Sequence, residues 1–167
     1  MTTFRDQPMP PGSAVAATIE RLVVVEAVPV RGDGVAAALA ATGRYHVTIH
    51  HRPVEAMASA RWAAADPPRL AVIDLWYPET AVDGVDVAEA FARWCPETAL
   101  VLRGGEPGPS CDRLAANWRR LQPLSLLLKS RPLSEQVAIL DELVRIGLPY
   151  RDPAWRLGRP VQDEPGP

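Results

Sequence analysis

The residues most able to do chemistry in this chain are two acids and two cations that stand at the ends of apolar runs. Lys129 is the one lysine among 18 basic residues and follows such a run, as do Glu26, Asp74 and Arg103. Lysine places a compact charge on a flexible stem, which suits it to pairing with one carboxylate or phosphate in a crevice. These side chains could form one charged site if the fold brings the ends of the runs together.

Five short apolar or alternating runs predict β-strands, and helical patterns separate them. Two of the predicted helices are followed by a glycine, Gly43 and Gly147, as is common at a helix end. Strands alternating with helices predict a parallel sheet covered on both faces. The predicted strands are 21–25, 45–50, 70–74, 98–102 and 124–128, and the predicted helices are 35–42, 53–65, 85–94, 110–121 and 133–146.

In an open α/β sheet, ligands bind beyond the carboxyl ends of the strands, where the strand order reverses. The residues at those ends are therefore the candidates for function. They are Glu26 and Ala27, His50 and His51, Asp74, Arg103 and Lys129.

The composition is that of a globular domain and predicts no particular charged partner. Of the 167 residues, 47% are hydrophobic and 23% charged, and the net charge is −2, which gives no electrostatic footprint for nucleic acid. We expect no membrane span, a cytoplasmic protein, and no direct contact with nucleic acid or membrane. We expect a flexible segment over 1–19, one domain over 20–147 and a loose, proline-rich tail over 148–167.

Four sequence segments carry a resemblance to a known family. They are VVVEAVPVRGDGV, AVIDLWYP followed by DG, CPETALVL, and LLLKSRPLSEQV. Together they resemble the CheY-like receiver domain of two-component response regulators, over about 21–147, in the style of receivers of LuxR- or NarL-type regulators. The resemblance implies a flavodoxin-like, doubly wound, five-stranded parallel sheet of order 2-1-3-4-5, with helices on both faces.

The resemblance also implies roles for single residues. Asp74 falls on the phosphate-accepting aspartate, and Lys129 on the lysine that contacts that aspartate and its phosphoryl group. Pro78 matches the proline of the loop that follows, and Gly84 matches its glycine, although this loop is two residues longer than the commonest form.

The chain departs from the family at the acidic pair that holds Mg²⁺. This pair reads Glu26-Ala27, so the second acid is replaced by a methyl group. Mg²⁺ requires near-octahedral oxygen ligands. Glu26, Asp74 and the backbone carbonyl of Trp76 remain as candidate ligands, and we expect Mg²⁺ binding to be weak.

A second departure lies at the switch position, where the family has Thr or Ser. Here the residue is Arg103. An inward guanidinium could pair with Asp74 or Glu26 and substitute a fixed cation for the metal. Such an opposite charge would lower the pKa of Asp74. The alternative is an arginine that points to solvent.

Two further candidate sites have less support. His46, His50 and His51 lack the Cys or Glu neighbours of a metal site. Trp76 and Tyr77, beside the predicted site, could form an exposed apolar patch for a ligand or partner.

These features predict a regulatory interaction module rather than an enzyme. The expected protein is an atypical, stand-alone receiver with weak or absent Mg²⁺-dependent phosphorylation, controlled by a protein partner, a homodimer or a small ligand. A histidine kinase and a transcriptional regulator are the expected kinds of partner. The alternative is a phosphorylated relay protein in which Asp74 is the nucleophile, Glu26 the metal ligand and Lys129 the electrostatic clamp. A flavodoxin-like cofactor binder is disfavoured because no phosphate-cradling loop follows the first predicted strand.

Overall fold

The computed structural model describes residues 19–77, 80–104, 109–117, 120–121, 124–147 and 149–153. Its centre is a five-stranded, all-parallel sheet in the order β2-β1-β3-β4-β5. The strands are β1 Glu20–Val25, β2 Tyr45–His50, β3 Leu70–Asp74, β4 Ala99–Gly104 and β5 Leu124–Leu128. The predicted fold class and strand order are confirmed.

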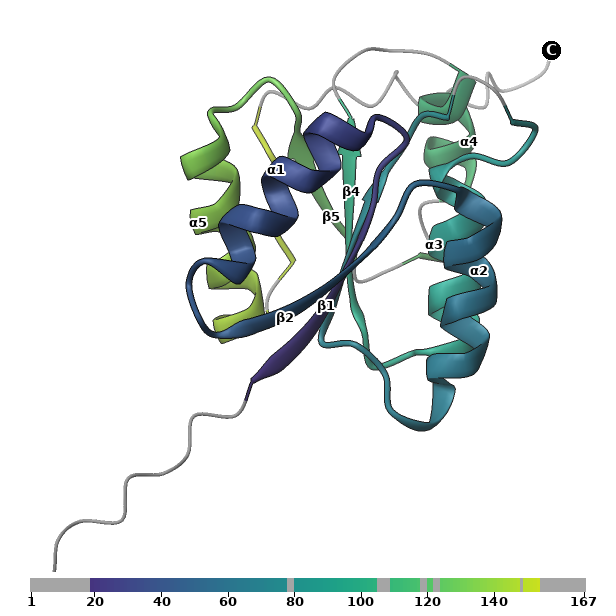
Figure 1. The fold of residues 1–167 in the computed structure, drawn as a ribbon. Coiled ribbons are helices and arrows are strands. Elements are labelled where there is room, and N and C mark those ends of the chain that lie inside the picture. The colour runs from purple at the N-terminus through teal and green to yellow at the C-terminus, as the bar shows by residue number, and fades with distance from the viewer. Residues whose placement is uncertain are drawn as a thin grey trace, which may run out of the picture.

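Helices cover both faces of the sheet. They are α1 Pro29–Ala40, α2 Pro53–Trp62, α3 Gly84–Trp94, α4 Pro109–Asn117 and α5 Leu133–Ile146, and a short 3₁₀ turn, Ala63–Ala65, extends α2. α1 and α5 lie on one face, while α2, α3 and α4 lie on the other (Figure 1). Among the described residues, no helix is long and apolar enough to cross a membrane.

The central strand β3 shows why the apolar runs are continuous rather than alternating. Leu70 and Val72 pack in the core beneath α1 and α5, while Ala71 and Ile73 pack in the core beneath α2 and α3. Both faces of a central parallel strand are buried, so both sets of side chains are apolar. The last residue of this strand, Asp74, is therefore held at a rigid point of the sheet.

Two helices differ from the sequence prediction at their ends. α1 begins at Pro29, six residues before the predicted start, because proline suits the first helical turn although Gly32 and Gly34 weaken the local helical pattern. α4 begins at Pro109 and ends at Asn117, so it is shorter than the predicted 110–121.

The strand β4 extends beyond its predicted end at residue 102. Arg103 pairs in register with Asp74 on one side and with Leu127 on the other. Arg103 therefore lies within the sheet, and its backbone is fixed on both sides.

The expectation of a loose tail from residue 148 is wrong for its first described part. Arg151 forms an isolated parallel bridge with Leu126 of β5. The amide of Leu126 donates to the carbonyl of Tyr150 at 2.8 Å, and the amide of Asp152 donates to the carbonyl of Leu126 at 3.0 Å. The physical reason is that β5 is an edge strand, whose outward backbone groups are available for pairing.

Candidate functional site

Four charged side chains from four neighbouring strand ends meet at the carboxyl edge of the sheet. Lys129 Nζ lies 3.1 Å from Glu26 Oε1 and also contacts Asp74 Oδ2. Arg103 Nη1 lies 3.3 Å from Glu26 Oε2. We call Glu26, Asp74, Arg103 and Lys129 the charge cluster. These are the four residues that follow apolar runs in the sequence. They meet because the parallel strands place their carboxyl ends at the same edge of the sheet.

The charge cluster is almost fully removed from solvent. Glu26 is 0% exposed, Asp74 2% and Arg103 3%, whereas the side chain of Lys129 is 17% exposed. Buried charges are tolerated only when they are paired and hydrogen-bonded. The cluster holds two carboxyl groups and two cations, and Lys129 is its member most open to solvent.

Arg103 takes the inward of its two predicted orientations, with Glu26 rather than Asp74 as its hydrogen-bonded partner. Its Nε donates to Gln136 Oε1 at 3.1 Å. Gln136 Nε2 in turn donates to the carbonyls of Lys129 at 3.2 Å and Arg131 at 2.7 Å. The guanidinium is therefore held between a carboxylate and a buried amide.

Gln136 is a site residue that the sequence analysis missed. It is 4% exposed and lies on α5, one helical turn before the buried Leu140. A polar residue on the apolar stripe of an amphipathic helix is a detectable signal, because a buried amide needs partners.

The two carboxyl groups of the cluster differ in acidity. Burial raises the pKa of Asp74 to about 7, a hydrogen bond with Glu26 adds to this rise, and Lys129 opposes it. For Glu26, burial acts to raise the pKa, but Asp74 and Lys129 outweigh it and the pKa is lowered. Asp74 therefore keeps a proton up to near neutral pH while Glu26 is ionised. The expected lowering of the Asp74 pKa by an inward arginine is wrong, because the guanidinium binds Glu26 and burial dominates at Asp74.

All four carboxylate oxygens of the cluster already have donors. Glu26 Oε1 accepts from Lys129 and, at 3.3 Å, from the amide of Val28, and Glu26 Oε2 accepts from Arg103. Asp74 Oδ2 contacts Lys129, and Asp74 Oδ1 accepts from the amide of Trp76 at 3.2 Å. The ammonium of Lys129 thus contacts both carboxyl groups that remain as candidate ligands for a divalent cation.

The positions next to the charge cluster, Ala27 and His51, add no carboxylate to it. Ala27 is partly buried and packs its methyl group against the core beneath α2 and α3. Ring atom Nδ1 of His51 lies 3.0 Å from the carbonyl oxygen of Glu26, and its Nε2 lies 3.5 Å from Asp33. Within the described ranges, no three His, Cys, Asp or Glu side chains are grouped as metal ligands would be.

Gly84 allows the start of α3 to approach the backbone of Asp74. A Cβ at this position would lie 2.1 Å from the carbonyl oxygen of Asp74 and 2.7 Å from Leu75 Cα. The amide of Gly84 donates to the carbonyl of Leu75 at 3.2 Å, and the side chain of Asp83 caps the helix. No other residue type fits here without moving the backbone.

The prediction of an exposed aromatic patch is wrong for Tyr77. Trp76 is 61% exposed beside the charge cluster, but Tyr77 is buried and its hydroxyl donates to the carbonyl of Val25 at 3.1 Å. Tyr77 thus ties the loop to β1. Pro78 lies outside the described residues.

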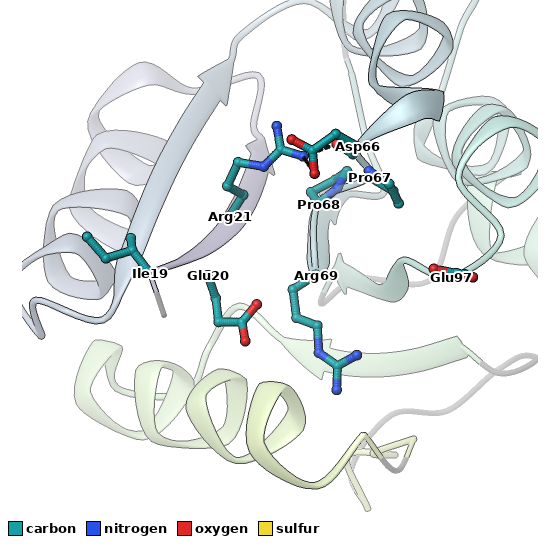
Figure 2. Close-up of a pocket in the computed structure, with 8 residues that line it drawn as sticks. All are labelled: Ile19, Glu20, Arg21, Asp66, Pro67, Pro68, Arg69 and Glu97. Atoms are coloured by element: carbon teal, nitrogen blue, oxygen red, sulfur yellow. Dashed lines mark hydrogen bonds and ion pairs between the residues drawn. The ribbon is translucent and has the colours of Figure 1, made fainter. Parts of the chain in front are cut away.

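A hollow on the molecule lies at the opposite end of the sheet from the charge cluster. Figure 2 shows its lining residues, which include Glu20 at the start of β1 and Arg69 just before β3. Arg21 and Asp66 form an ion pair at 2.6 Å on its rim, with both side chains well exposed. This hollow is separate from the four strand ends that carry the candidate site.

Comparisons with known proteins agree with the fold. No family model matches the chain, and no curated protein matches it. Among solved structures, the chain is similar to a LuxR-family two-component response regulator from an Aurantimonas species, with a TM-score of 0.64 and 17% identity, over 81% of this chain and 91% of that chain.

Two isolated receiver domains give similar values. The receiver domain of the putative response regulator NarL from Mycobacterium tuberculosis has a TM-score of 0.59 and 24% identity, over 77% of this chain and 98% of that one. The receiver domain of NtrX from Brucella abortus has a TM-score of 0.59 and 17% identity, over 75% and 98%. The chain therefore has the fold of response regulator receiver domains.

Proposed function

We propose that this protein is an atypical receiver that acts as a signalling interaction module, with weak or absent Mg²⁺-dependent phosphorylation. The observation that carries the proposal is the ammonium of Lys129 lying between Glu26 and Asp74, with Arg103 bound to Glu26. This arrangement gives the two carboxylates fixed protein cations as partners.

The chemistry of acyl phosphate formation supports this proposal. A carboxylate nucleophile must be ionised, and the charge of the incoming phosphoryl group must be neutralised. Burial keeps the pKa of Asp74 near 7, so part of the population is protonated at neutral pH. With Ala27 in the acidic pair, only Glu26 and Asp74 remain as side-chain ligands, and both are engaged by donors.

We further propose that the protein is not an enzyme, is cytoplasmic, and acts through protein partners such as a histidine kinase or a transcriptional regulator. The receiver fold supports this proposal, because receivers couple one protein to another. A homodimer is compatible with the same role.

The test is incubation of the full chain with Mg²⁺ and acetyl phosphate, followed by intact-mass measurement. We expect no stoichiometric gain of a phosphoryl group. A stoichiometric, hydroxylamine-sensitive gain that disappears in Asp74→Asn would overturn the proposal and establish the alternative, a phosphorylated relay protein.

That alternative is favoured by one observation, the contact between Lys129 and Asp74, which is what an electrostatic clamp on an acceptor requires. It predicts Mg²⁺ binding near Trp76, visible as fluorescence quenching that is absent in Trp76→Phe. We expect no quenching at tens of millimolar Mg²⁺. The cation would have to displace the ammonium of Lys129 from Glu26 and Asp74.

A further inference from the structure

The outward face of α2 carries apolar side chains that the described part of the chain leaves exposed. Val54 is 61% exposed and Trp62 85%, and Ala58 between them is exposed as well. The three stand four residues apart, so they form one stripe along the helix, which we call the outer stripe. The inward face is also apolar, because Ala56 and Ala60 are buried in the core beneath α2 and α3. A helix that is apolar on opposite faces is typically covered on both.

The outer stripe has the shape of a helix-packing surface. α2 packs against β2 and beside α3, and it lies at the outside of the molecule (Figure 1). The larger side chains, Val54 and Trp62, stand at the two ends of the stripe, and the small Ala58 stands at its middle. The distance between packed helices depends on the side chains at their contact, so a second helix can approach closely at Ala58.

Two residues of opposite charge flank the outer stripe. Glu55 stands three residues before Ala58, and Arg61 stands three residues after it. Among the described residues Arg61 has no ion pair, and its guanidinium carbon lies 5.6 Å from the centroid of the Trp94 ring. Glu55 lies 3.4 Å from Arg52, but both side chains are well exposed, so this pair contributes little. Both charges are therefore available to a partner.

These positions complement a second copy of the same helix. If two α2 helices pack in antiparallel orientation about a twofold axis at Ala58, residues equally far before and after Ala58 lie at the same level. Trp62 then lies level with Val54 of the second copy, and Arg61 lies level with Glu55 of the second copy. A twofold interface must be complementary to itself, and every such contact occurs twice. The outer stripe meets this condition in both its apolar and its charged residues.

We propose that the outer stripe of α2 is the interface of a homodimer in which two copies pack α2 against α2 in antiparallel orientation. The helix has 10 residues, and at 1.5 Å per residue it is about 15 Å long. Contact through this helix alone is smaller than the roughly 1,200 Å² of stable interfaces, so the dimer forms reversibly. The inference adds an interface to the proposed interaction role and does not depend on whether Asp74 is phosphorylated.

Sedimentation equilibrium of the full chain, from about 1 μM to about 1 mM, tests for the dimer. We expect the average mass to rise toward twice that of the chain, and Val54→Ala to weaken association at least about tenfold. Val30→Ala is the matched control, because Val30 is also exposed and also follows the proline that begins its helix, α1. It should leave association unchanged. A wild-type chain that stays monomeric throughout, or a dimer that Val54→Ala does not weaken, would overturn the proposal.

Charge reversal tests the antiparallel orientation. Glu55→Arg and Arg61→Glu each place like charges at the same level in the dimer, so each should weaken association at least about tenfold at low ionic strength. The double variant Glu55→Arg/Arg61→Glu reverses both charges and should restore association to within about threefold of the wild type. A double variant as weak as the single ones would exclude the antiparallel pairing.

A mixing experiment tests the position of the twofold axis. Ala58 faces its own copy in the proposed dimer, so Ala58→Glu and Ala58→Lys should each be monomeric alone and form a heterodimer when mixed. Both introduce good helix formers at an exposed position, and urea midpoints close to the wild-type value would show that both fold. Folded variants that do not associate on mixing would contradict an axis at Ala58. The assays contain no Mg²⁺ or phosphodonor, so their failure leaves the proposed receiver function standing.

Discussion

Arg103 and Glu26 form a buried ion pair across 3.3 Å between the end of β4 and the residue after β1. The guanidinium side chain is 4% exposed and the carboxylate side chain 0%. Where a receiver would neutralise its acidic residues with a metal ion, this chain has a permanent cation attached to the sheet.

Arg103→Met should destabilise the protein strongly. Removing one partner of a buried ion pair leaves the other charge, here the Glu26 carboxylate, buried without that counter-charge. Such a loss typically lowers the free energy of unfolding by about 3–5 kcal/mol. Urea unfolding checks the loss. Arg145→Met is the control, because its pair with Glu142 is exposed on both sides and should contribute no more than about 1 kcal/mol. Equal effects of the two substitutions would contradict the ion-pair interpretation.

Stability should fall as the pH rises from about 5 to about 8. The pKa of Asp74 is raised from 3.8 to about 7 in the folded state, so the folded chain binds more protons than the unfolded chain in this window. A raised pKa of an acid contributes stability at low pH, and that contribution is lost as the pH rises through the folded value. The pKa of Glu26 is lowered, so its opposite effect belongs to more acid pH.

Asp74→Asn should remove this pH dependence and stabilise the protein at pH 8 by an amount on the order of a few kcal/mol. Asp112→Asn, which changes an exposed carboxyl on α4, should leave the slope as it is. Urea midpoints measured across the pH range check both variants. A slope that persists in Asp74→Asn would assign the titration to another group.

Gly84→Ala should destabilise the protein by about 1–3 kcal/mol or more, because the added Cβ would lie 2.1 Å from a backbone oxygen. Gly34→Ala is the matched control within α1. Apart from its chain neighbours and the backbone of its own helix, a Cβ added there meets no described atom within 4 Å, so alanine should stabilise the helix by about 0.5–1 kcal/mol. Thermal melting distinguishes the two signs, and a neutral Gly84→Ala would mean that α3 can shift away from Asp74.

Restoring the missing parts should create a metal site. In Ala27→Asp/Arg103→Thr a second carboxylate is added and the fixed cation removed, so we expect Trp76 quenching by Mg²⁺ at a concentration about tenfold or more below that of any wild-type response. Ala27→Asn/Arg103→Thr serves as the control without the added charge. Equal Mg²⁺ responses in a folded pair of variants would show that the added acid does not decide metal binding.

The sequence alone predicted the bounds of those strands and helices whose local pattern reflects their burial. The bounds of β2, β3, β5 and α5 agree with the predicted ranges, since continuous apolar runs and helical periodicity reflect burial directly. Parallel strands end at one edge of a sheet, so the meeting of Glu26, Asp74 and Lys129 also follows from their places after these runs.

Only the tertiary structure decided the rest. The direction of Arg103, the role of Gln136 and the pairing of residues 149–153 depend on partners that are distant in the sequence. The raised pKa of Asp74 likewise depends on how fully the fold removes this carboxyl group from water. Residue types and spacing determine which charges reach the edge of the sheet, but packing determines which of them pair, because a buried charge must be either paired or neutralised.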